Sequence, residues 1–96
     1  MVADELAVIV ARGRDAYEAD VAIRRAVERC IEIFGEAAKS LSPAFRDAHP
    51  EVEWSDVAKL RDRLSHHYHR IDPAQLWVIA TTYVPTAAAR ISSIEA

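Results

Sequence analysis

The feature that most constrains this chain is a long apolar stripe in its first half. Its members recur at spacings of three and four residues, the repeat of one face of an α-helix, and they are Ile23, Val27, Cys30, Ile31, Phe34, Ala38 and Leu41. The pattern predicts one long helix that begins near Asp15 or Asp20 and ends near Ser40. Such a helix is stable only when its apolar face packs against other elements, so the rest of the chain is expected to cover it.

A shorter helix is expected before this one, over about residues 3–12. It places Leu6, Ile9 and Val10 on one side, and Gly13 is a plausible stop because glycine favours helix ends.

Two prolines interrupt the pattern after the long helix. Pro43 and Pro50 exclude a continuous helix here and leave room for a single turn at 44–47. A third helix is then expected over about 54–67, with an apolar arc made of Trp54, Val57, Leu60, Leu64 and Tyr68.

The fourth expected helix opens at Asp72 and Pro73, an N-cap followed by a first-turn proline. It runs to about Ile91 with the apolar side chains Leu76, Ile79, Ala80, Tyr83 and Val84. Pro85 should kink it or end its regular part.

Composition supports an all-α chain. Only two glycines are present and 51% of the residues are apolar, and four antiparallel helices with short connections pack naturally as a four-helix bundle. Residues 1–96 are expected to form one domain. A chain of this length buries a thin core, so a homodimer that shares an apolar face is also expected.

The cellular location is expected to be cytoplasmic, without a membrane partner. No stretch approaches the roughly 18–20 uncharged residues of a membrane helix, and the N-terminal residues lack the basic region of a secretory signal. Cys30 is the single cysteine, so it forms no internal disulfide, and its place on the apolar stripe predicts a small buried side chain.

The net charge of −3 conceals a basic segment at residues 59–70. Four basic side chains there accompany the single carboxylate of Asp62, and three histidines lie among them. Because the whole molecule is weakly acidic, it does not attract nucleic acid in general, and any such binding is expected at this segment.

Arg61 lies in the middle of the apolar arc of the third helix. With Val57 at zero and about 100° per residue, Arg61 falls at about 40°, between Trp54 at about 60° and Tyr68 at about 20°. A guanidinium there needs a carboxylate, a phosphate or a wet cleft, because a buried unpaired charge is strongly unfavourable. An ion pair with a carboxylate such as Glu36, a side chain that reaches water and a phosphate site are all open interpretations.

His66 lies about 140° from Arg61 on an ideal helix, so one helix does not bring the two together. Histidine titrates near neutral pH, and with a cation and a phenol nearby it suits phosphoryl transfer; the alternative is a solvated surface residue. A metal site is not expected, because His66, His67 and His69 lack the spacing of a tetrahedral ligand set.

These residues form the pattern R-x-x-x-x-H-x-Y, with Arg61, His66 and Tyr68 at its fixed positions inside HPEVEWSDVAKLRDRLSHHYHRID. Together with the preceding AVERCIEIFGEAAKSLSP, this segment resembles the HepT family of HEPN-superfamily toxins. The resemblance implies a small homodimeric protein of four or five helices that cuts RNA without a metal ion or other cofactor.

The resemblance implies that Arg61 and His66 are the nuclease pair. In the family the two copies of the motif meet at the dimer interface, which would resolve the separation of the two side chains on one helix. Asp62 stands where many relatives have Asn, a departure that bears on the level of activity. Apart from the resemblance, Asp62 and Glu36 are predicted as supporting polar residues. Glu36 would orient Arg61 or His66, and a solvated carboxylate is an equally open interpretation of it.

The resemblance also implies the partners. HepT toxins are paired with a minimal nucleotidyltransferase antitoxin that transfers AMP to the motif tyrosine, Tyr68 here. AMP at Tyr68 would fill the phosphate site beside Arg61 and His66 and exclude RNA. A structural role for Tyr68 is equally open, with its ring on the apolar arc and its hydroxyl at a wet edge.

The leading hypothesis is therefore an endoribonuclease toxin of a type VII-like toxin–antitoxin module, which cleaves RNA through attack by the 2′-hydroxyl at a composite site between protomers; no DNA partner is expected. One alternative is a non-catalytic helical partner subunit that binds nucleotide or complements a nucleotidyltransferase. Another is a structural homodimer in which Arg61 forms an interfacial ion pair.

Overall fold

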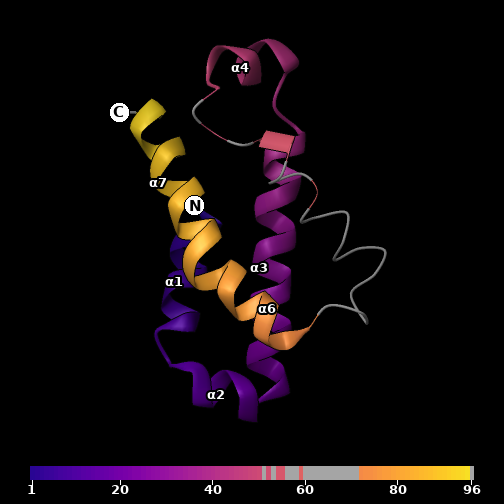
Figure 1. Cartoon of the computed structure of the whole chain (residues 1–96), viewed down its shortest axis with the longest axis vertical. Coiled ribbons are helices and arrows are strands. Elements are labelled where there is room, and N and C mark those ends of the chain that lie inside the picture. Colours follow the sequence, from indigo (N-terminus) through magenta and orange to yellow (C-terminus); the bar gives the residue numbers. More distant parts are fainter. Residues whose placement is uncertain (51, 53, 56–58, 60–71, 96) are drawn as a thin grey trace.

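The computed structural model describes residues 1–50, 52, 54, 55, 59 and 72–95, and within those ranges its regular elements are all helical (Figure 1). They are α1 (Val2–Val10), α2 (Arg14–Ala19), α3 (Val21–Lys39), α4 (Pro43–Ala48), α6 (Pro73–Val78), the π-helical turn η2 (Ile79–Tyr83) and α7 (Val84–Glu95). The all-α prediction is confirmed for this part of the chain. The four-helix bundle and the homodimer stay predictions, since most of the expected third helix lies outside the described residues.

Helix α3 carries the predicted apolar stripe, and the prediction is confirmed: Val27, Cys30, Ile31, Phe34 and Ala38 are all buried. The helix begins where Asp20 caps it, because the Asp20 side chain accepts a hydrogen bond from the Ala22 N–H at 2.9 Å. Neither α3 nor any other helix in the described ranges combines the length and hydropathy needed to cross a bilayer.

The N- and C-terminal helices cover the apolar face of α3. Helix α1 contacts α3, η2 and α7, and its Leu6 is 2% exposed. The continuous rod of α6, η2 and α7 crosses α3 in Figure 1, contacts α1 through η2 and α7, and shares one buried core with α3. Its buried face consists of Leu76, Ala80, Val84 and Ala87. The core is therefore a layer shared by α1, α3 and this rod.

Both of the alternative helix starts expected from the sequence, near Asp15 and near Asp20, are found in the structure: α2 begins at Arg14 and α3 at Val21. Gly13, at φ +96°, precedes α2, and this backbone conformation strains residues that have a Cβ. Asp20 is extended, with φ −121° and ψ 112°, so it separates α2 from α3. The single helix start expected near Asp15 or Asp20 is thus resolved into a short helix and a long one.

The C-terminal rod extends past the expected end at Ile91 and continues to Glu95. The interruption expected at Pro85 appears just before it, as the π-helical turn η2. Proline has no N–H to donate to the preceding turn, and a π-helical turn is a common way to continue a helix past such a gap. The rod therefore continues through Pro85 without ending.

Helix α4 is the single turn expected between the two prolines. The Ser42 hydroxyl accepts a hydrogen bond from the Phe45 N–H at 3.1 Å, and Pro43 occupies the first turn, where a missing N–H does no harm. The helix ends at Ala48, two residues before Pro50. It forms a corner beyond the C-terminal end of α3 (Figure 1).

Candidate active site

The motif residues Arg61, Asp62, His66 and Tyr68 lie outside the described residues, so their contacts stay predictions. The structure instead describes what holds the chain on either side of them. Trp54 lies seven positions before Arg61, and Asp72 lies four positions after Tyr68.

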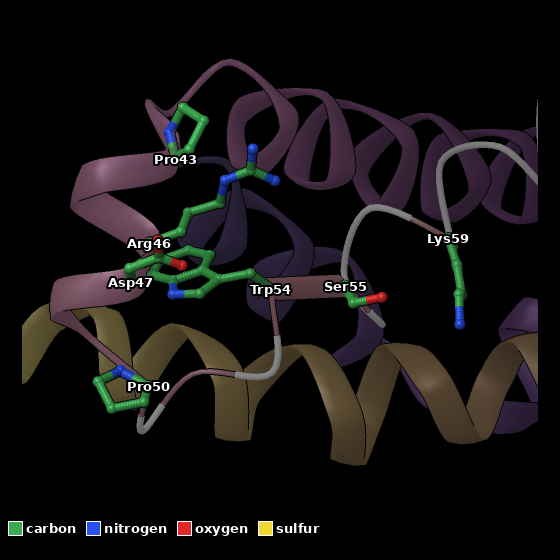
Figure 2. Close-up of a pocket in the computed structure, with 7 residues that line it drawn as sticks. All are labelled: Pro43, Arg46, Asp47, Pro50, Trp54, Ser55 and Lys59. Carbon is green, nitrogen blue, oxygen red and sulfur yellow. The ribbon is translucent and has the colours of Figure 1, made fainter.

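Trp54 fixes the chain before the motif. Its side chain is 7% exposed, and its indole Nε1 donates a hydrogen bond to the carbonyl oxygen of His49 at 2.9 Å. The Phe45 ring packs against Trp54, with ring centroids 6.2 Å apart, and against the imidazole of His49 at 4.7 Å. Figure 2 shows the indole between α4 and the C-terminal rod. The expected packing role of Trp54 is confirmed.

The apolar surroundings of Trp54 extend to α3. Trp54 lines a cavity of about 330 Å³ together with Phe34 and Ala38 of α3 and Ile91 of α7. Val52, which is 3% exposed, adds to the same core. The segment that enters the motif is therefore held by both a hydrogen bond and apolar packing.

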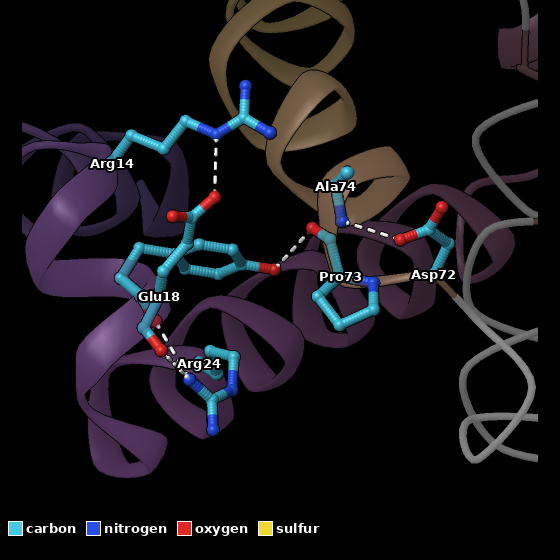
Figure 3. A network of polar contacts seen from close by, with 7 residues as sticks. Arg14, Glu18, Arg24, Asp72, Pro73 and Ala74 are labelled. Atoms are coloured by element: carbon cyan, nitrogen blue, oxygen red, sulfur yellow. Dashed lines mark hydrogen bonds and ion pairs between the residues drawn. The ribbon is translucent and has the colours of Figure 1, made fainter.

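A hydrogen bond from Tyr17 fixes the chain after the motif. The Tyr17 hydroxyl donates to the carbonyl oxygen of Pro73 at 2.7 Å, across 56 residues of sequence (Figure 3). At the same place Asp72 caps α6, where its carboxylate accepts a hydrogen bond from the Ala74 N–H at 2.9 Å. The predicted N-cap at Asp72 and Pro73 is confirmed.

A second set of hydrogen bonds, from Arg24, fixes the backbone around Tyr17. Arg24 donates from Nη1 to the carbonyl oxygens of Tyr17 at 3.1 Å and Glu18 at 2.6 Å, which satisfies the end of α2 (Figure 3). The Tyr17 ring packs on the half-buried ring of Trp77 with centroids 5.0 Å apart.

The chemistry of Tyr17 is that of a permanent donor near neutral pH. Burial raises the pKa of the Tyr17 phenol above its ordinary value, and the carboxylate of Glu28 adds to the increase. The hydroxyl therefore keeps its proton and its hydrogen bond to Pro73.

Glu36, the predicted supporting carboxylate, lies on the C-terminal half of α3 and is partly buried. Its backbone carbonyl accepts a hydrogen bond from the Ser40 N–H at 3.1 Å. The orientation of Arg61 or His66 by Glu36 stays a prediction, because neither partner is among the described residues. Within the described ranges, no group of three or more histidine, cysteine or acidic side chains is placed to hold a metal ion.

Tyr17 and Arg24 were not among the residues singled out from the sequence. Tyr17 is the one aromatic side chain in the short polar stretch RDAYEAD, and a lone aromatic residue before a helix cap is a weak signal of anchoring. No local pattern identifies its acceptor, since Pro73 lies 56 residues further along.

Comparisons with known proteins agree on one family. The family model "Ribonuclease HepT-like" matches residues 2–94. The Methanocaldococcus jannaschii protein named "Putative RNase MJ0127" is 38% identical over 80 residues, which cover 83% of this chain and 66% of that protein. "Probable ribonuclease HepT" of Thermococcus cleftensis is 39% identical over 61 residues, covering 64% of this chain and 56% of that protein.

A third relative, "Putative RNase TTE0752" of Caldanaerobacter subterraneus subsp. tengcongensis, is 33% identical over 75 residues, with 78% of this chain and 67% of that protein covered. No solved structure matched the chain. The matches span between about half and two thirds of the length of these curated relatives. With a family model that matches almost every residue, this chain belongs to the HepT-like ribonuclease family.

Proposed function

We propose that this chain is a metal-independent endoribonuclease in which Arg61 and His66 form the active site. The observation that carries the proposal is the family match over residues 2–94, which contains the pattern R-x-x-x-x-H-x-Y formed by Arg61, His66 and Tyr68. The anchors at Trp54 and Tyr17 support it, since they hold both ends of the segment that bears this pattern. Fixed ends limit the positions that the intervening side chains adopt, which favours catalysis.

The proposed reaction is transesterification of the RNA backbone. The 2′-oxygen attacks the adjacent phosphorus, the bond from phosphorus to the 5′-oxygen breaks, and the products are a 2′,3′-cyclic phosphate and a 5′-hydroxyl. One His66 accepts the proton of the 2′-hydroxyl as general base, and a second protonated His66 donates a proton to the leaving 5′-oxygen. Arg61 binds the phosphate and stabilises the negative charge that develops on its oxygens.

This scheme needs two copies of the motif in one cleft. Arg61 and His66 lie about 140° apart on an ideal helix, so a homodimer that joins the two motifs supplies what one protomer lacks. Two basic segments at such a cleft would concentrate positive potential and attract RNA despite the net charge of −3. RNA binding is then expected to weaken steeply with salt.

We further place the chain in a toxin–antitoxin module with a minimal nucleotidyltransferase as the antitoxin. Transfer of AMP from ATP to the Tyr68 hydroxyl would release pyrophosphate and leave a phosphodiester on the tyrosine. Its negative charge and bulk beside Arg61 and His66 would exclude the RNA phosphate. The modification is tested by incubation with ATP, magnesium and the partner, which should add multiples of about 329 Da at Tyr68. Tyr68→Phe is the control and should stay unmodified.

The cleavage itself is tested with purified protein and total cellular RNA in EDTA. Wild type should cut the RNA and leave 2′,3′-cyclic phosphate ends, and His66→Ala should lower the rate by roughly 100-fold or more. His69→Ala is the matched control, because it removes a histidine of the same segment that the pattern does not include.

Cleavage that stops in EDTA and returns with zinc would contradict the metal-independent scheme. No cleavage by wild type with Tyr68 shown to be unmodified would contradict the nuclease assignment. The non-catalytic partner subunit would then be the better account.

A further inference from the structure

An open pocket of about 600 Å³ lies beside the predicted active-site segment, between α4 and the residues that enter that segment (Figure 2). The described residues that line it are Pro43, Arg46, Asp47, Pro50, Trp54, Ser55 and Lys59. Trp54 is held by its hydrogen bond to His49, so this wall of the pocket is fixed.

Arg46 is the side chain in this pocket that most clearly lacks a partner. Its Nε atom is buried and forms no hydrogen bond within the described part of the chain. A buried N–H without an acceptor destabilises the folded state, and more so when the group is charged. In Figure 2 the Arg46 guanidinium lies on the Ser55 side of the indole. An oxygen ligand in the pocket would supply the missing acceptor.

The charges of the pocket favour an anion. Arg46 and Lys59 contribute two positive charges and Asp47 one negative charge. Among the described residues, no carboxylate lies within ion-pair distance of either cation. The Asp47 carboxylate lies at the far end of the pocket from Lys59 (Figure 2). The Ser55 hydroxyl, which lies between Trp54 and Lys59 in Figure 2, adds a neutral donor.

We propose that this pocket binds a backbone phosphate of the RNA strand, outside the phosphate that is cleaved. This inference rests on the proposed function and adds to it a positioning subsite made of Arg46, Lys59 and Ser55. An arginine fork and a lysine are the usual ligands of phosphate. Lys59 stands two residues before Arg61 in the sequence, so an RNA strand bound by Arg61 would need to extend only a short way to reach Lys59.

A backbone contact of this kind positions the strand without reading its bases. Phosphate contacts carry no sequence information, and each one on a single strand adds about 0.7 to the slope of log affinity against log salt. The pocket is therefore expected to raise affinity for every RNA sequence and to increase the salt dependence of binding.

The test measures binding of a short, fluorescently labelled 2′-O-methyl RNA by anisotropy over a range of salt concentrations. This probe has no 2′-hydroxyl, so binding is measured apart from cleavage. Arg46→Gln should weaken binding roughly tenfold and lower the salt slope by about 0.7, and Lys59→Gln should act in the same direction. Arg12→Gln is the matched control, since Arg12 is an exposed arginine between α1 and α2, and α2 lies at the opposite end of the molecule from α4 (Figure 1).

A fourth variant gives an effect of opposite sign. Asp47→Asn removes the one carboxylate of the pocket, so it should tighten RNA binding several-fold. Circular dichroism melts check that each variant folds. If Arg46→Gln does not fold, Lys59→Gln and Asp47→Asn decide the matter, because both positions are exposed.

Unchanged affinity and salt slope in the folded variants would overturn the proposal. So would stabilisation of wild type by inorganic phosphate without any effect of the variants on RNA, because the pocket would then bind a free anion. Failure of the proposed function gives a different result. Wild type would bind the probe in an Arg46-dependent way and still leave unmodified RNA uncut.

Discussion

The two ends of the segment that carries Arg61 and His66 are held in different ways. Before the segment, Trp54 donates its hydrogen bond to His49, only five residues away, and packs with its neighbour Phe45. After the segment, Tyr17 reaches Pro73 across 56 residues. One end is thus fixed mostly by the corner around α4, and the other by a link to the N-terminal helices.

The two anchors also differ in the kind of interaction that stabilises them. The anchor at Trp54 depends on buried aromatic surface, which contributes in proportion to its area. The anchor at Tyr17 depends on one directional hydrogen bond whose acceptor is a backbone carbonyl. Loss of the first should therefore cost more stability than loss of the second.

Trp54→Ala should have the largest effect on folding. Removal of this buried indole, which is 7% exposed, should lower the free energy of unfolding by about 3–5 kcal/mol. Trp77→Ala, at the other end of the segment, removes a half-buried ring and should lower it by about 1–2 kcal/mol. Urea denaturation followed by circular dichroism measures both. Equal losses would show that the two ends do not differ in the way described.

Tyr17→Phe should have an intermediate effect. The change keeps the ring on Trp77 and removes only the donor to Pro73, so the free energy of unfolding should fall by about 1–2 kcal/mol. If Tyr17→Phe is as stable as wild type, the long-range link does not hold this end of the segment.

The stability that the Tyr17 hydroxyl contributes should depend on pH. Because burial raises the pKa of Tyr17, its stabilising contribution is complete below the unfolded-state pKa of about 10 and is lost as the pH rises through the folded-state pKa. The stability difference between wild type and Tyr17→Phe should therefore stay constant up to about pH 10 and shrink as the pH rises further. A difference that stays constant above about pH 10 would mean that the phenol has no raised pKa.

Loss of the helix caps at Ser42 and Asp72 should have the smallest effects on stability, and the two effects should be similar in size. Ser42→Ala and Asp72→Ala each remove one side-chain acceptor, from Phe45 N–H and Ala74 N–H respectively, and each should destabilise by about 1 kcal/mol. Asp72 lies four positions after the motif, whereas Ser42 acts on the motif only through the α4 corner, so Asp72→Ala should slow RNA cleavage more than Ser42→Ala. Equal cleavage rates in the two variants would argue against a role for this end in positioning the motif.

The sequence predicted best what depends on local pattern. The stripe on α3, the turn of helix between Pro43 and Pro50, and the cap at Asp72 all follow from spacing or from residues next to each other. The buried state of Cys30 follows from its place on the same stripe. Such features require no knowledge of which distant segments meet.

The features that the sequence did not predict depend on tertiary structure. The bond from Tyr17 to Pro73 joins segments that no periodicity relates. The π-helical turn η2 at 79–83 precedes Pro85, where a kink or an end was expected, and both η2 and the helix that continues the rod contact α1. The pocket of Arg46 and Lys59 likewise joins the α4 corner to the basic segment.

Arg61 and Arg63 offer the most direct test of the central claim, that the motif itself cleaves RNA and the basic segment only attracts it. The two arginines are two residues apart in the same segment, and only Arg61 belongs to the pattern. The measurement is the single-turnover rate of RNA cleavage in EDTA for Arg61→Ala and Arg63→Ala. The account predicts a loss of roughly 100-fold or more for Arg61→Ala and a small, salt-dependent loss for Arg63→Ala. Equal losses in the two variants, or none in either, would contradict it.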